Sequence, residues 1–174
     1  MKEFTVTAIG EDRPGIVAAV TEILLHLGCN LADCSMSLLR GQFAMLLLIE
    51  APEEMDPERL EAALSEPAGR LSLSIATRRV AAQGPPAAGR PYVVSFYGND
   101  RPGIVHRISK ALAEAEVNIC NLASHLVGDG IYFVVLDIDA PAGVEPAELE
   151  AGLKEIASEL GISLTLRSGE GTLL

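Results

Sequence analysis

The sequence predicts an α+β protein made of two successive β-α-β-β-α-β units, each forming a four-stranded antiparallel sheet with two helices on one face. Two observations lead to this prediction. The hexapeptide Asp-Arg-Pro-Gly-Ile-Val occurs at residues 12–17 and again at residues 100–105. The spacing of apolar residues also switches between the two-residue period of a strand and the 3.6-residue period of a helix, in the same order in both halves. A whole domain is therefore repeated.

The repeat sets the expected domain boundaries. We expect one domain over residues 1–80, a second over residues 92–170, and a linker between them at residues 81–91, where Gly, Pro and Ala predominate. A unit of this size has a small core and open sheet edges, which favours docking against another domain, edge to edge or face to face.

The first unit opens with a strand at residues 4–9, where apolar and polar residues alternate. A helix follows, with Pro14 in its first turn and an apolar stripe to about Leu27. Asp12 or Arg13 must then be its cap, and Asp12 has the better side chain for that role. Gly28 suits the left-handed residue that ends a helix. Two strands at residues 30–39 and 43–49, a helix that starts at Asp56-Pro57 and a strand at residues 71–75 complete the unit.

The second unit repeats these patterns in strands at residues 92–97, 131–138 and 162–166, in a strand that starts at Asn118-Ile119, and in two helices between them. Glu116 replaces Gly28, so we expect this helix to end differently from the first. His125 stands where the first half has Ser37, so the two halves need not bind a ligand equally.

Composition limits the function classes. Of 174 residues 49% are apolar, and the net charge of −11 disfavours direct contact with nucleic acid. No apolar run reaches the roughly 18 residues of a membrane span, and no signal region is visible, so a cytoplasmic protein is expected. Cys29, Cys34 and Cys120 do not form a disulfide framework and are interpreted as small buried apolar residues. The His and Cys spacing matches no metal site, and no cofactor or catalytic motif is expected.

The repeated corner, where the first strand of each unit meets the following helix, is the candidate ligand site. Helix amides bind carboxylates, and side-chain oxygens accept from an ammonium group, which together suit a free amino acid. In the first half the donors are Gly15 and Ile16, Arg13 adds charge, and the acceptors are Asp12, Asn30 and Asp33. Their equivalents in the second half are Gly103, Ile104, Arg101, Asp100, Asn118 and Asn121.

A simpler interpretation stays open for several of these residues. Asp12 and Asp100 can serve only as helix caps, and Arg13 and Arg101 can be solvated. Asn30 and Asn118 follow a helix end, where Asn is common for backbone reasons.

The doubled hexapeptide and the Asn-apolar start of the next strand, at Asn30-Leu31 and Asn118-Ile119, resemble tandem ACT domains, in particular the glycine cleavage system transcriptional repressor family. The resemblance implies two ferredoxin-like domains that bind a small amino-acid effector at interfaces between ACT domains, near the first loop. It also implies a homo-oligomer, such as a homodimer, that acts by touching a DNA-binding activator and not DNA.

Three functions follow for testing. The first is a non-enzymatic regulator that senses an amino acid, with glycine as the candidate from the family, and controls transcription of glycine or amino-acid metabolism through protein contact. The second is a detached regulatory subunit of an amino-acid metabolic enzyme, which co-purification would distinguish. The third is catalysis, which a loss of activity on mutating Cys34 or His125 would support.

Overall fold

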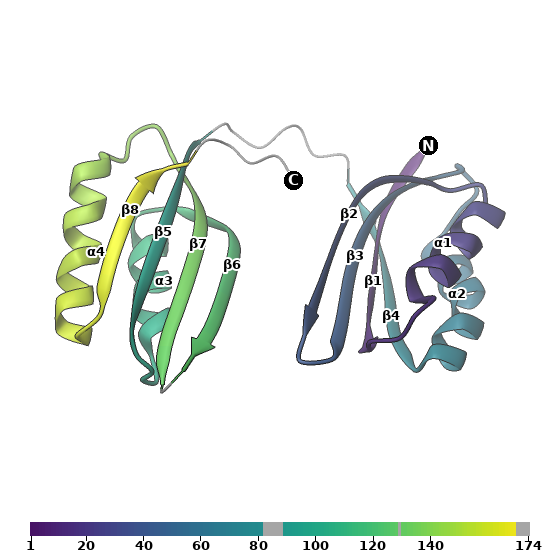
Figure 1. Ribbon diagram of the computed structural model, residues 1–174. Coiled ribbons are helices and arrows are strands. Elements are labelled where there is room, and N and C mark those ends of the chain that lie inside the picture. The colour runs from purple at the N-terminus through teal and green to yellow at the C-terminus, as the bar shows by residue number, and fades with distance from the viewer. Residues whose placement is uncertain (82–88, 129, 170–174) are drawn as a thin grey trace. The chain divides into compact units, whose positions relative to one another are not determined.

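The computed structural model describes residues 1–81, 89–128 and 130–169. The chain forms two compact units, one on each side of residues 82–88. Both have the element order β-α-β-β-α-β and a four-stranded antiparallel sheet with two helices packed on one face (Figure 1), which confirms the predicted fold class. The predicted linker at residues 81–91 lies mostly outside the described residues, and the last part of that range already belongs to a strand that starts at Arg90. The predicted domain boundaries stay a prediction.

The two units contain equivalent elements in the same order. In the first they are β1 (Lys2–Glu11), α1 (Ile16–His26), β2 (Asn30–Leu39), β3 (Gln42–Ala51), α2 (Pro57–Leu71) and β4 (Leu73–Val80). In the second they are β5 (Arg90–Asn99), α3 (Ile104–Glu114), β6 (Asn118–Val127), β7 (Ile131–Ala140), α4 (Pro146–Leu160) and β8 (Ser163–Ser168). The strand orders, β2-β3-β1-β4 and β6-β7-β5-β8, leave β2 and β6 at sheet edges.

The core of each unit lies between the helices and the helix-covered face of the sheet. Phe4, Val6 and Ala8 of β1 are buried there, as their alternation predicts. The apolar run of β3 contributes Phe43 and Leu47 to the same core, while Leu46 points to the uncovered face and stays 47% exposed. The second unit has a separate core built in the same way.

The start of α1 differs from the prediction. The helix begins at Ile16, its N-cap is Gly15 with a φ of 95°, and no side chain caps it. The predicted cap at Asp12 and the predicted place of Pro14 in the first helical turn are therefore wrong. The equivalent cap at Asp100 is wrong too, because α3 starts in the same way after Gly103. The left-handed glycine lies between the aspartate and the helix, so the aspartate is not at the position from which a side chain reaches the second or third helical amide.

The start of α2 agrees with the prediction. The Asp56 side chain accepts a hydrogen bond of 2.8 Å from the backbone N–H of Arg59, and Pro57 is the first helical residue. Aspartate followed directly by proline is thus a correct cap signal here. The two residues between Asp12 and Gly15 break that arrangement in α1.

The ends of α1 and α3 are alike, which contradicts the prediction that Glu116 changes the second one. Gly28 has a φ of 69° and Glu116 a φ of 56°, so both are left-handed. Their amides donate to the carbonyls of Leu25 and Ala113, each at 3.0 Å. Glu116 adopts the backbone conformation that a glycine holds in the first unit, at the cost of strain around its Cβ.

The edge strands are almost uncovered. Every residue of β2 is exposed, and Ile119 and Ser124 are the only half-buried residues of β6. Cys34 and Cys120 lie on these strands and are exposed, so the prediction that they are buried is wrong. Cys29 is half-buried, and burial raises the pKa of its thiol.

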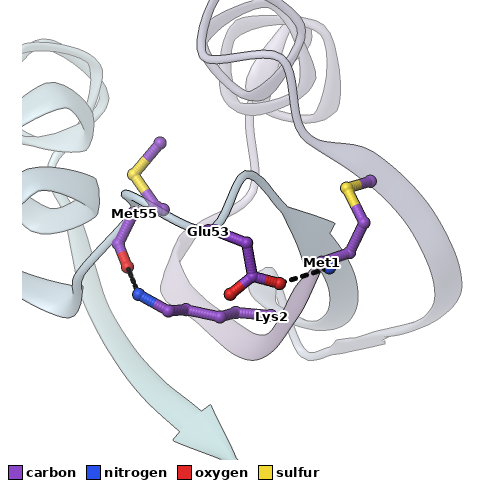
Figure 2. A network of polar contacts seen from close by, with 4 residues as sticks. All are labelled: Met1, Lys2, Glu53 and Met55. Carbon is purple, nitrogen blue, oxygen red and sulfur yellow. Dashed lines mark hydrogen bonds and ion pairs between the residues drawn. The ribbon is translucent and has the colours of Figure 1, made fainter.

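The first residues of β1 are tied to the loop between β3 and α2, as Figure 2 shows. The Met1 ammonium group forms an ion pair of 2.5 Å with Glu53, and the Lys2 Nζ donates to the Met55 carbonyl at 3.0 Å. The ammonium group holds the pKa of the Glu53 carboxyl below its ordinary value. Both groups of the ion pair are exposed, so it adds little to stability.

Candidate functional site

The corner between β1 and α1 presents a set of unpaired backbone amides. Gly15 lies in the left-handed region, and the first helical hydrogen bond runs from the Ala19 amide to the Gly15 carbonyl at 2.9 Å. Within the described residues, the amides of Ile16, Val17 and Ala18 have no acceptor in the protein. Because no side-chain cap occupies this turn, the positive end of the helix dipole is open to an anion.

The second corner has the same backbone geometry. Gly103 has a φ of 94°, and Arg107 donates the first helical hydrogen bond to its carbonyl at 3.0 Å. A Cβ added to Gly15 or Gly103 would meet no atom within 4 Å. A glycine is therefore needed at this position because of the positive φ and not because a side chain would clash. The space beside the turn is open.

The arginines of the two corners differ in their partners. Arg13 forms an exposed ion pair of 2.7 Å with Glu11. Asn99 occupies the position of Glu11 in the second unit, and Arg101 has no ion-pair partner among the described residues. The second corner thus has a cationic side chain that is available to an anionic ligand.

The predicted acceptors Asn30 and Asp33 do not lie near Gly15. They are at the start of β2, which follows the C-terminal end of α1, whereas Gly15 is at its N-terminal end. An 11-residue helix spans about 16 Å. A single domain therefore does not bring its predicted donors and these acceptors onto one small ligand.

The acceptors also have local partners. The Asp33 Oδ1 accepts from the Cys34 amide at 2.7 Å. In the second unit the Asn121 side chain donates to Asp137 at 3.0 Å, and the Asn118 side chain contacts the sulfur of Cys120 at 3.8 Å. The remaining carboxylate and amide oxygens of these exposed residues stay free to accept from a ligand.

Sequence reasoning missed two parts of the corner. Val17 and Ala18 add free amides, and the hairpin glycine Gly41 accepts a hydrogen bond of 2.9 Å from the Asp12 amide. The sequence indicated a turn at Gly41 between two strands, but the contact of Gly41 with the corner depends on strand register.

In the described ranges no group of three or more His, Cys, Asp and Glu side chains is placed to hold a metal ion. No described helix has both the length and the apolar character that a membrane span requires.

Comparison with known proteins agrees with this architecture. Two models of the ACT domain match the chain, one over residues 2–77 and the other over residues 92–160. The chain is 25% identical over 160 residues to the glycine cleavage system transcriptional repressor of Escherichia coli (strain K12), which covers 89% of this chain and 84% of the relative.

Solved structures give the same result for the fold. A protein of unknown function from Galdieria sulphuraria superposes with a TM-score of 0.82 and 25% identity over 97% of this chain and 98% of that one. A protein proposed to be a glycine cleavage system transcriptional repressor superposes with a TM-score of 0.73 and 19% identity over the same shares of the two chains. Each half of the chain is thus an ACT domain, and the protein belongs to the ACT-domain family as a homologue of the glycine cleavage repressor.

Proposed function

We propose that this protein is a non-enzymatic regulator that senses a small amino acid, with glycine as the first candidate, and controls transcription of amino-acid metabolism through contact with another protein. The observation that carries the proposal is the pair of uncapped helix starts at Gly15 and Gly103, whose free amides suit a carboxylate. The relative from Escherichia coli is a glycine cleavage system transcriptional repressor, which supports the link to glycine and to transcription.

A second copy of the chain would complete the site. If the exposed β2 edges of two copies pair antiparallel, the start of one strand lies beside the end of the other. The end of β2 leads to Gly41, which accepts the hydrogen bond from Asp12 at the corner. Asn30 and Asp33 of one copy would then approach the corner amides of the other copy, and one zwitterion would find both its donors and its acceptors.

This arrangement explains how binding could be transmitted. An effector held between two chains stabilises the paired state by its differential affinity for that state. The surface available to a protein partner would therefore change with the concentration of the effector. The acidic net charge of −11 is consistent with a protein partner in place of DNA.

Calorimetric titration of the full chain with glycine and the other common amino acids tests the proposal. The Val17 amide has no helical partner, so Val17→Pro removes a donor without breaking a helical hydrogen bond. We expect the double variant Val17→Pro/Val105→Pro to weaken glycine affinity at least tenfold.

The double variant Val17→Ala/Val105→Ala is the matched control, because it shortens the same side chains and keeps both amides. Its affinity should stay within twofold of the unmodified protein. Silence in calorimetry across all common amino acids would reject the sensing function. Co-purification with a metabolic enzyme, in place of a transcription factor, would reject the transcriptional output alone.

A further inference from the structure

The second ACT domain has a groove on its helical layer, away from the corner and the sheet edges. The groove has a volume of about 530 Å³ and lies between α3, α4 and the loop that precedes α4. Its floor consists of Ala111, Ala115, Leu149 and Leu153, and a Cβ added to Gly152 would meet no atom within 4 Å. Its lining extends along α4 from Glu145 to Ile156, about 16 Å of helix.

The groove exists because small residues replace large ones at the seam between the two helices. At the offset of 88, Ala111 and Ala115 correspond to Ile23 and Leu27 of the first domain. Ile23 and Leu27 are half-buried and pack against the first core. The seam between the two helices is therefore filled by large apolar side chains in the first domain and is open in the second, although the backbone arrangement is the same.

The rim of the groove is acidic. Glu114, Glu145, Glu148 and Glu155 line it, and no basic residue does. Lys110 approaches Glu114 at 3.7 Å in an exposed pair, and the other three carboxylates have no ion-pair partner among the described residues.

The first domain has a different charge at two of the four equivalent positions. Glu114 corresponds to His26 at the offset of 88, and Glu148 corresponds to Arg59 at the offset of 89 that aligns the starts of α2 and α4. Glu145 and Glu155 correspond to the acidic residues Asp56 and Glu66. The second domain thus has carboxylates where the first has an arginine and a histidine, on the same rim where its apolar side chains are smaller. Four carboxylates around an apolar floor attract a ligand that is both cationic and apolar.

We propose that this α3–α4 groove binds a basic amphipathic helix of a partner protein. The apolar side of such a helix fits the floor, as in other helix-in-groove complexes, and its Lys or Arg side chains reach the glutamates on both sides. The groove is long enough for anchors at positions i, i+3, i+4 and i+7 of the incoming helix. The proposal goes beyond amino-acid sensing and does not require the corner to bind any effector.

The test uses the full chain and a fluorescein-labelled peptide of about 18 residues, with leucine at i, i+3, i+4 and i+7 spacing and lysine elsewhere. We expect saturable binding in fluorescence anisotropy, weaker at high salt, and NMR shift changes confined to α3, α4 and the loop before α4. Ala111→Ile/Ala115→Leu restores the residues of the first domain and should abolish binding. Glu148→Arg should weaken it about tenfold or more.

Glu58→Arg on α2 is the matched control, because it changes the net charge by the same amount on an exposed helix of the first domain. Affinity for the peptide should stay within twofold. An equal loss in Glu58→Arg and Glu148→Arg, shift changes spread over both domains, or no saturable binding would each overturn the proposal. Both Glu148→Arg and Glu58→Arg alter exposed side chains, so the comparison holds even if the core-side double variant fails to fold.

Discussion

The backbone amide of Asp12 donates a hydrogen bond of 2.9 Å to the carbonyl of Gly41. Asp100 and Gly130 form the same contact at 3.0 Å in the second domain. The bond ties the end of the first strand to the hairpin between the next two strands. The aspartate side chain takes no part in it and forms no helix cap, which leaves the carboxylate available for another role.

This geometry separates two aspartates that look alike in the sequence. Asp12→Ala should change the free energy of unfolding by less than about 0.5 kcal/mol, because no side-chain hydrogen bond is lost. Asp56→Ala removes the cap of α2 and should cost about 1 kcal/mol. Urea denaturation of the two variants measures the difference. Equal losses would mean that the Asp12 side chain stabilises the helix after all.

The left-handed helix ends give a second prediction. Glu116→Gly should raise the free energy of unfolding by about 1 kcal/mol, because glycine removes the strain at a φ of 56°. Gly28→Ala should lower it by a similar amount, since a Cβ there meets only Pro52 at an ordinary 3.7 Å and the cost is in the backbone.

The ends of α2 and α4 provide a control for these variants, because here the first domain has the non-glycine residue and the second domain has the glycine. Ser72 has a φ of 56° where the second domain has Gly161 with a φ of 64°. Thermal melts should therefore show Ser72→Gly shifting in the same direction as Glu116→Gly. A fall in melting temperature for both glycine variants would contradict the strain argument.

The exposed edge strands predict self-association. Met36 of β2 and Leu122 of β6 are 50% and 44% exposed, on strands with open hydrogen-bonding edges. Sedimentation velocity at micromolar concentration should show a dimer or larger species. Met36→Lys/Leu122→Lys should shift it toward monomer, because charges on an edge oppose pairing.

Leu25→Lys is the control for the edge variant, because Leu25 is 73% exposed on α1 and not on an edge. It should sediment like the unmodified protein. A monomeric unmodified protein, or an edge variant that still associates, would argue against pairing through β2 and β6.

Acid titration offers a test at the start of the chain. The pKa of Glu53 is lowered, chiefly by its hydrogen bond to the Met1 ammonium group. A depressed folded pKa means that the pair stabilises the fold above the ordinary glutamate pKa and that this contribution disappears as the pH falls through the folded value. NMR titration should find Glu53 protonating below the ordinary value. High salt should reduce the shift, because both groups of the pair are exposed to solvent. An ordinary pKa at low salt would contradict the contact.

The fold was predictable because its signals are local and occur twice. Alternation at Phe4, Val6 and Ala8 fixes which face of β1 is buried, and the 3.6-residue stripe of α1 does the same for the helix. The repeated hexapeptide then indicates that the second half has the same topology. The helix start at Ile16 was not predictable from capping preferences, because Pro14 also suits a first turn. The signal for a later start was Pro14-Gly15, since proline followed by glycine is typical of a type II turn, and Gly15 has the φ of 95° and ψ of −4° that such a turn gives its glycine.

The candidate site was predictable only in part, because its geometry depends on placement in space. The amides at Gly15 follow from the helix start. The position of Asn30 at the far end of α1 follows from chain direction, which a list of polar residues does not reveal. The exposure of Cys34 and Cys120 depends on which strand lies at the edge, and their own alternating pattern is equally compatible with a half-buried strand.

The alanines at the α3–α4 seam show where the two copies of a duplicated domain differ. The sheet, the corner and both helix ends keep one geometry in the two copies, while a few residues on the outer layer differ in bulk and sign. Both copies have kept the same corner between strand and helix, while the seam between the two helices of the second copy is less filled than that of the first. New specificity can be acquired there without disturbing what the twin copies share.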